Sequence, residues 1–474
     1  MLRHMTKGSA LLLVSLVETG APFIRMLLLT HALSLTELGF VSALSATVSG
    51  FEQISDFALY RYVFSSAREE YQRALAAAHG LAVLRGLTLC GLLALAAPLF
   101  ARVFNLEDHV FDFVLLGPVV LLRGFDHLAP RVFERDYRYG PQLKAIGASY
   151  ALSLGVLAIA VRIIPTHVAF LISLYVQIIV QVALDHIVAG EKYRCAFFTP
   201  NFGRAFRFGY PLMANGTGLA ASSQGDRFLI GGLLGLPELA VYSVATLATY
   251  VPSSLITRVS STVTLAQLYN AAKHGEACYC ARLRLFARLL PLVAAFFALG
   301  VFSLLNIVMP LVFGAKFVLS PTSTALLALS IFFRQARGDP FSSMLLNEAR
   351  TKRLAIANLS STSTVLFVLV LLLIFHSFEA VMAGRLLGEL TATAVTLAVT
   401  RDLFKPARRD FMKAVACGLS VLGLAIALGP AGVGVALVPS VAMVAAGLAV
   451  FGLWALSFMP DLLNASFPTI QLRA

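Results

Sequence analysis

Fourteen apolar segments, each close to 20 residues long, run through almost the whole chain, and polar or Gly/Pro-rich breaks separate them. A helix needs about 20 mostly apolar residues to cross a membrane. The composition agrees, since 58% of the residues are hydrophobic and only 13% are charged, whereas soluble proteins carry roughly 25% charged residues. The sequence therefore predicts an all-α integral membrane protein with about fourteen transmembrane helices. The predicted spans are 9–31, 39–60, 76–100, 113–133, 143–163, 167–188, 207–232, 239–262, 286–312, 321–345, 354–375, 379–400, 413–430 and 434–457.

The loops between these spans predict the orientation, because Lys and Arg stay on the cytoplasmic side of a membrane. If the N-terminus is cytoplasmic, 26 Lys and Arg residues fall on that side, and only Arg102, Arg162 and Lys316 fall on the other. The alternation runs through all fourteen spans and places both termini in the cytoplasm. The net charge of +13 is then mainly a signal of topology, and it requires no nucleic-acid partner.

Two similar stretches lie about two hundred residues apart: "LSLTELGFVSA" at 33–43 and "LGLPELAVYSVA" at 234–245. Arg25 precedes the first and Arg227 the second, and a weaker match sets Arg123 beside Arg337 and Asp126 beside Asp339. The copies are six spans apart, so they enter the membrane in the same direction and form a parallel repeat. Chance similarity in a Leu-, Ala- and Gly-rich chain is the alternative. The repeat predicts two six-helix lobes, 1–200 and 201–405, with an appended hairpin at 406–474.

Charged residues inside the predicted spans are the candidates for a binding site, because each costs about 2.5–3.5 kcal/mol at the centre of a membrane helix unless it faces a cavity or a partner. The second lobe has a surplus of arginine over acid, which favours an anionic cargo. Local spacing allows structural pairs of Arg385 with Glu389 and of Arg123 with Asp126. The candidate cavity arginines are Arg25, Arg123, Arg227, Arg258 and Arg337, and the acids that could couple transport to an ion are Glu52, Asp56, Asp126, Asp226 and Asp339.

Glu52 and Asp56 are four residues apart, so the two carboxylates lie on one helix face and repel each other unless a cation lies between them. Arg25 from a neighbouring helix could supply that charge, and a bound proton or sodium ion is the alternative. The five cysteines are scattered and the nine histidines show no metal-binding spacing. The sequence therefore assigns no metal and no cofactor.

Several stretches resemble one known family: "RMLLLTHALSLTELG" at 25–39, "GFEQISDFAL" at 50–59, "ERDYRYGPQ" at 134–142, and "FGYPLMANG" with "GDRFLIGGLLGLPELAVYSVA" between 208 and 245. The chain resembles the polysaccharide and oligosaccharide-lipid flippases of the MOP superfamily, which also contains the multidrug and toxin extrusion (MATE) transporters. It departs from them at Gln267, where a proline-containing helix end is expected, and this leaves the local geometry open.

The resemblance implies a transporter of the bacterial inner membrane that moves undecaprenyl-diphosphate-linked sugar repeat units to the periplasmic leaflet. It also implies basic cavity residues in helices 1, 2, 7 and 8, which fall on Arg25, Arg61, Arg227 and Arg258 of this sequence. The expected partners are the lipid-linked oligosaccharide and the membrane lipids, with a proton or sodium ion as the open alternative for coupling.

Two related transporters are the alternatives: a MATE-type exporter of cationic drugs, which would need an acidic cavity, and a flippase for the lipid-linked peptidoglycan precursor. A membrane-embedded enzyme would need a soluble catalytic domain or a large outer loop. The longest loops between the predicted spans have about 20 residues, so the sequence predicts no enzyme.

Overall fold

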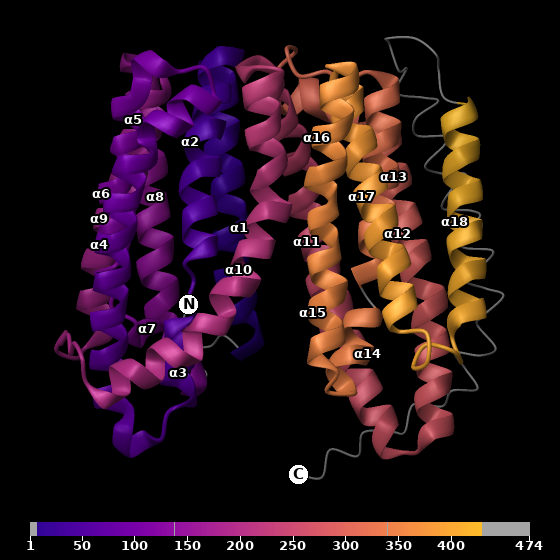
Figure 1. The fold of residues 1–474 in the computed structure, drawn as a ribbon, viewed down its shortest axis with the longest axis horizontal. Coiled ribbons are helices and arrows are strands. Elements are labelled where there is room, and N and C mark those ends of the chain that lie inside the picture. The colour runs from indigo at the N-terminus through magenta and orange to yellow at the C-terminus, as the bar shows by residue number, and fades with distance from the viewer. Residues whose placement is uncertain (1–6, 137, 339, 429–474) are drawn as a thin grey trace. The chain divides into compact units, whose positions relative to one another are not determined.

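The computed structural model describes residues 7–428 apart from 137 and 339, and in this part of the chain the regular structure is entirely helical (Figure 1). The first lobe predicted above contains α1–α9, and the rest of the described chain contains α10–α18. The helices are α1 Lys7–Ala32, α2 Leu35–Ile54, α3 Leu59–Ser65, α4 Tyr71–Val103, α5 Val110–Val114, α6 Leu116–Arg123, α7 Ala129–Val132, α8 Gly140–Ile163, α9 His167–Ala189, α10 Pro200–Leu233, α11 Leu236–Lys273, α12 Glu276–Phe313, α13 Pro321–Gly338, α14 Phe341–Asn347, α15 Thr351–Leu359, α16 Ser363–Phe375, α17 Phe378–Val399 and α18 Arg408–Leu428.

Nine helical stretches among the described residues are long and apolar enough to cross a membrane. They correspond to nine of the predicted spans. Four other predicted spans are helical but do not meet this criterion, because they are broken or carry more polar residues: α2, α5–α7, α10 and α13–α14. The last predicted span, 434–457, lies outside the described residues. An all-helical membrane protein is confirmed, and the number fourteen stays a prediction.

The predicted single helix at 113–133 is wrong, since the chain there forms the short helices α5, α6 and α7. Residues 124–128 separate α6 from α7, and Pro130 lies in the first turn of α7. A proline lacks the amide hydrogen and disfavours helical backbone at the residue before it, so helices usually end before such a position. This break leaves Arg123 as the last residue of α6.

The described chain forms two compact units. Among the described residues, unit 1 comprises 7–251, 309–318 and 359–388, and unit 2 comprises 252–308, 319–358 and 389–428. These bounds differ from the predicted lobes, because α10, the first part of α11, α16 and the first half of α17 belong to the same unit as the N-terminal helices. The division into two repeated lobes therefore stays a prediction.

Within unit 1, α2 packs against α10 and against the start of α11 with very close backbones. A Cβ atom on Gly216 of α10 would overlap the carbonyl oxygen of Gln53 at the end of α2. A Cβ atom on Gly39 of α2 would overlap the carbonyl group of Leu236. Small residues allow such approach between membrane helices. The glycines therefore allow α2 to pack closely against α10 at one end and against the start of α11 at the other.

Unit 2 has its own apolar core, formed by α11, α12, α14 and the residues around the start of α18. The rings of Phe341 and Phe404 are tilted against each other, with centroids 4.3 Å apart, and the ring of Phe411 lies edge-on to both. All three side chains are at most 2% exposed. This cluster packs the connection before α18 against α14.

Candidate functional site

The intramembrane charges of the first nine helices gather around Glu52 in the last turn of α2. Arg123 at the end of α6 donates a hydrogen bond to Glu52 Oε2 at 2.9 Å. Arg85 of α4 donates to Ser55 Oγ at 3.0 Å, one turn from Glu52. An arginine from another helix therefore neutralises Glu52, and that arginine is Arg123 where the sequence suggested Arg25. The Arg123 side chain remains 40% exposed, so a ligand can reach it.

Arg25 of α1 has a different environment, because the hydrogen-bond partners of its guanidinium group are neutral. Its Nη2 donates to the Gln177 side chain of α9 and, at 3.2 Å, to Ser153 Oγ of α8. The guanidinium carbon lies 5.8 Å from the ring centroid of Tyr150 and 5.9 Å from that of Phe170. Its Nε is buried and has no hydrogen-bond partner among the described residues. Arg25 thus keeps a positive charge that no contacting carboxylate balances.

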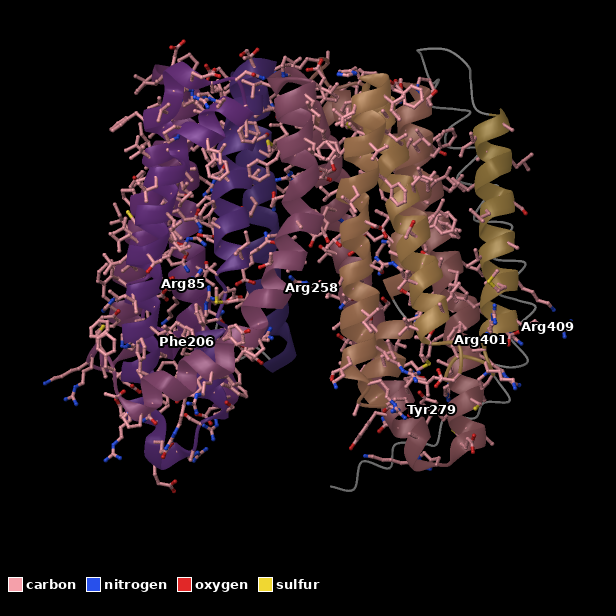
Figure 2. The ribbon with its side chains drawn as sticks, in the orientation of Figure 1. Arg85, Phe206, Arg258, Tyr279, Arg401 and Arg409 are labelled. Carbon is pink, nitrogen blue, oxygen red and sulfur yellow. The ribbon has the colours of Figure 1, made fainter. Side chains whose placement is uncertain are left out.

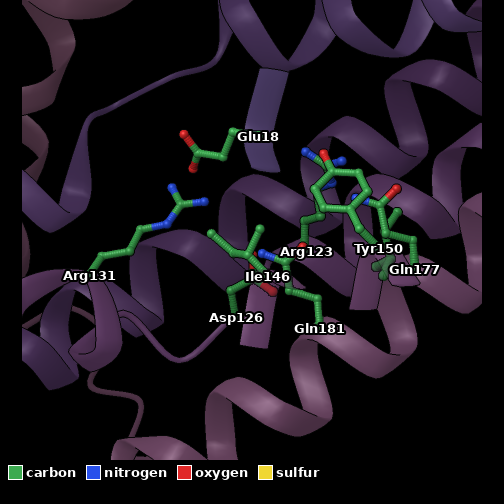
Figure 3. A pocket seen from close by; sticks show the side chains of 9 residues that line it. Glu18, Arg123, Asp126, Arg131, Ile146, Tyr150, Gln177 and Gln181 are labelled. Atoms are coloured by element: carbon green, nitrogen blue, oxygen red, sulfur yellow. The ribbon is translucent and has the colours of Figure 1, made fainter. Parts of the chain in front are cut away.

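An open cavity lies beside these arginines, with a volume of about 450 Å³ including the solvent at its mouth. Figure 3 shows Arg123 and Asp126 on one wall, and Glu18 of α1 pointing toward Arg131 of α7. The remaining lining residues are Ile146 and Tyr150 of α8 and Gln177, Ile178 and Gln181 of α9. Arg25 contacts two of them, Tyr150 and Gln177, so its guanidinium group is at the edge of this cavity.

Gln177 and Gln181 were not identified from the sequence, although a signal was present. They are polar residues four positions apart within an apolar span, which places them on one face of α9. That face lines the cavity.

A second charged cluster in unit 1 joins α10, α11 and α17. Arg385 donates to Asp226 Oδ2 at 2.9 Å, and the Tyr242 hydroxyl group donates to the same oxygen. The carboxylate is 4% exposed. Beside it, Arg227 donates to Gln224 at 3.2 Å. Asp226 therefore has a structural ion-pair partner from a distant part of the sequence.

Unit 2 also contains a buried ion pair, between Arg337 of α13 and Glu389 of α17. The two groups are 3.1 Å apart and each side chain is 11% exposed. Local spacing had suggested Glu389 as a partner of Arg385 and Asp126 as a partner of Arg123. Instead, the ion pairs of Arg385, Arg337 and Arg123 each join two different helices. The low exposure of Arg337 and Glu389 indicates that these two residues form a structural pair.

The cavity lining does not include Asp56, Arg61 or Arg258. Asp56 Oδ1 accepts a hydrogen bond from the amide of Ala58 at 2.8 Å, and Ala58 has a left-handed backbone with φ of 46°. Asp56 thus stabilises the turn between α2 and α3. Arg61 donates to the Tyr60 hydroxyl group at 2.9 Å, a bond that raises the Arg61 pKa. Arg258 in unit 2 is exposed (Figure 2), and Asp339 lies outside the described residues.

A bundle of long apolar helices that shelters arginines and carboxylates beside an open polar cavity defines a membrane transporter. The model of the family described as "Polysaccharide biosynthesis protein" matches residues 28–321. This is more than half of the chain, and the chain therefore belongs to the polysaccharide biosynthesis protein family. A search of curated proteins found no match.

Solved structures with the same fold are also transporters. A lipid II flippase MurJ in an inward closed conformation is 14% identical, with a TM-score of 0.71, covering 95% of this chain and all of the other. An inward-facing MATE transporter of the MOP superfamily is 13% identical, with a TM-score of 0.63, covering 84% and 99%. A MOP superfamily transporter from Pyrococcus furiosus, reported with a reversed polarity of its binding pocket, is 14% identical with a TM-score of 0.54, covering 84% of this chain and 94% of the other. At such low sequence identity, these similarities show that the chain has the MOP transporter fold, and they do not show its substrate.

Proposed function

We propose that the protein is a flippase that moves undecaprenyl-diphosphate-linked oligosaccharide or polysaccharide repeat units across the bacterial inner membrane. In this proposal both termini are cytoplasmic, and the lobes 1–200 and 201–405 expose the binding cavity alternately to the two sides. The appended hairpin predicted at 406–474 lies mostly outside the described residues. Membership of the polysaccharide biosynthesis protein family supports the substrate class.

Arg25 is the observation on which the proposal rests. A lone cation inside a membrane span is costly unless an anion or a polar cavity compensates it. The contacts of Arg25 with Gln177 and Ser153 supply hydrogen bonds and no negative charge. A phosphate oxygen would supply that charge and could accept the unused hydrogen of Nε. Guanidinium groups bind phosphate through paired hydrogen bonds, so Arg25 fits a diphosphate linkage.

The rest of the cavity fits a sugar diphosphate bound to a lipid. Arg123 is accessible next to Arg25. Gln177, Gln181 and Tyr150 line the cavity and offer the hydrogen bonds that sugar hydroxyl groups require. The polar head of such a lipid cannot cross about 30 Å of hydrocarbon without such a shelter. We assign Arg25 and Arg123 to the diphosphate. Arg61, Arg227 and Arg258 stay sequence predictions for the same role.

Glu52 is the candidate for ion coupling. Its Oε1 is buried and has no hydrogen-bond partner among the described residues, while Oε2 binds Arg123. A proton or sodium ion at Oε1 would weaken the Glu52–Arg123 pair and free Arg123 for the phosphate. Asp126 lines the same cavity and is the second carboxylate available to the ion. Asp56 is less suited, because its carboxylate holds the α2–α3 turn.

A flippase for the peptidoglycan precursor has the same fold and also carries a lipid diphosphate, so the sugar component separates the two proposals. A MATE-type exporter of cationic drugs requires an excess of negative charge in the cavity. The lining contains Arg123 and Arg131 against Glu18 and Asp126. Arg25 at the edge is offset by Glu52, which pairs with Arg123, so the site has no excess of negative charge. This balance disfavours a cationic cargo.

Replacing Arg25 by alanine is expected to reduce transport of undecaprenyl-diphosphate oligosaccharide by about 10- to 100-fold, which corresponds to the loss of a charged hydrogen bond of about 1.5–3 kcal/mol. Arg25→Lys keeps the charge but loses the paired geometry and should lie between wild type and Arg25→Ala. The measurement is flipping of a fluorescent lipid-linked substrate in proteoliposomes with matched amounts of protein.

Arg162→Ala is the matched control, because Arg162 is an exposed arginine in the last turn of α8. It should transport at the wild-type rate. Wild-type activity in Arg25→Ala, with equal protein incorporation, would refute the assignment of Arg25 to the diphosphate.

A further inference from the structure

Four residues from three distant parts of the sequence meet where three helices of unit 1 begin. Glu37 lies in the first turn of α2, and His167 is the first residue of α9. His109 precedes α5, and Asp112 lies in its first turn. The connections that carry them follow the first, third and fifth predicted spans, which all run outward, so the predicted topology places all four residues on the outer face of the membrane. The charged cavity described above does not include any of them.

The side chains of His109 and His167 both approach one carboxylate oxygen of Asp112. Asp112 Oδ2 lies 3.0 Å from His109 Nδ1 and 3.3 Å from His167 Nε2. One ligand atom from each of the three residues can be chosen so that all lie within 4.8 Å of one another. On the other side of the His167 ring, Nδ1 lies 2.9 Å from Glu37 Oε2. The His167 ring also packs on Phe40, with ring centroids 4.0 Å apart.

A neutral His167 ring has too few hydrogen atoms to donate a hydrogen bond to both of the carboxylates that it faces. A neutral imidazole has one N–H group, but both nitrogens of His167 face a carboxylate oxygen. If Nδ1 donates to Glu37, then Nε2 presents a lone pair to Asp112. Either a second proton or a metal ion must lie between Nε2 and Asp112 Oδ2.

We propose that His109, Asp112 and His167 bind a divalent transition-metal ion of the zinc class, with Glu37 as the group that orients His167. Zinc prefers imidazole nitrogen and carboxylate oxygen at about 2.0–2.2 Å in a tetrahedron, which sets neighbouring ligand atoms about 3.4 Å apart. The two measured nitrogen–oxygen distances, 3.0 and 3.3 Å, are close to that spacing.

Glu37 supports this assignment because histidines that bind a metal commonly donate their other N–H group to a carboxylate. The Glu37 carboxylate also accepts the backbone amide of His167 at 2.6 Å, which holds it in place. His109 is 44% exposed at its side chain and Asp112 is 17% exposed, so an ion can enter from the solvent and keep a water molecule as the fourth ligand. The bound ion would fasten the starts of α2, α5 and α9 to one another.

The test is zinc binding by the full-length protein in detergent, without an affinity tag that contains histidine. After equilibration with zinc chloride and removal of free metal, the wild type should retain one zinc ion per chain by elemental analysis. His109→Ala and Asp112→Asn should retain none, and Glu37→Gln should bind about 10- to 100-fold more weakly in calorimetric titration. Size-exclusion profiles show whether each variant is folded, and His109→Ala removes a side chain that is only partly buried.

His376→Asn is the control, because His376 is an exposed histidine outside the cluster. Its backbone is left-handed, with φ of 46°, and asparagine tolerates this conformation. It should bind zinc like the wild type. If the wild type retains no more zinc than folded Asp112→Asn, a doubly protonated His167 explains the cluster and the metal site is wrong. Replacement of zinc by cobalt should give the visible absorption of a tetrahedral site in the wild type. Absence of this absorption would contradict the proposed geometry.

Discussion

Asp226→Asn is expected to destabilise unit 1 by about 3–5 kcal/mol, the usual cost of removing one partner from a buried ion pair. The Asp226 carboxylate is 4% exposed and accepts hydrogen bonds from Arg385 and Tyr242. The amide that replaces it cannot balance the Arg385 charge. Since proteins are stable by only about 5–15 kcal/mol, the loss should be visible as a large fall in the midpoint of thermal unfolding in detergent.

The exposed pair of Glu70 with Arg204 provides the comparison. Its side chains are 47% and 59% exposed, and pairs of this kind contribute about 0.2–1 kcal/mol. Glu70→Gln should therefore change the midpoint little. The double variant Asp226→Leu with Arg385→Leu should recover much of the lost stability, because removing both charges leaves neither one unpaired. Equal midpoints for Asp226→Asn and Glu70→Gln would show that the buried pair has no structural role.

Gly39→Ala is expected to separate α2 from the start of α11, at a cost of about 1–3 kcal/mol for overpacking. The added Cβ atom would overlap the backbone of Leu236, which cannot rotate away as a side chain could. Gly216→Ala introduces the same conflict with the Gln53 carbonyl group at the other end of α2. In the proposed lobes these contacts join residues 1–200 to residues 201–405, so transport should also fall.

Gly50→Ala on the same helix is the matched control, because a Cβ atom there meets no atom within 4 Å. Alanine is a better helix former than glycine by about 1 kcal/mol, so this variant should unfold at the wild-type temperature or above it. Thermal unfolding of the three variants in one detergent measures the difference. A stability of Gly39→Ala equal to that of Gly50→Ala would mean that the close approach is absent in the protein.

The sequence predicted the helices well, because a span of 20 apolar residues has few alternatives in a membrane. It failed at 113–133, where Pro130 and the residues before it divide one expected helix into three. Charged residues inside the spans were recognised as site candidates, and Arg25, Glu52, Asp126 and Arg123 do gather around one region of unit 1.

Partners were harder to predict than positions. Helical spacing identifies neighbours three or four residues away, but the ion pairs Arg123–Glu52, Arg385–Asp226 and Arg337–Glu389 join residues 52–159 positions apart. The histidine cluster of the proposed metal site was missed for the same reason, since His167 comes from a different connection than His109 and Asp112. A single sequence holds no information on which helices are adjacent.

The most direct test of the proposed function compares two cargoes in the same proteoliposomes: a fluorescent undecaprenyl-diphosphate oligosaccharide and a fluorescent organic cation. The wild type should move the lipid-linked sugar between leaflets, and excess unlabelled lipid-linked sugar should compete with it. The cation should cross no faster than in empty liposomes. Export of the cation without movement of the lipid-linked sugar would contradict the flippase assignment and identify the protein as a cation exporter.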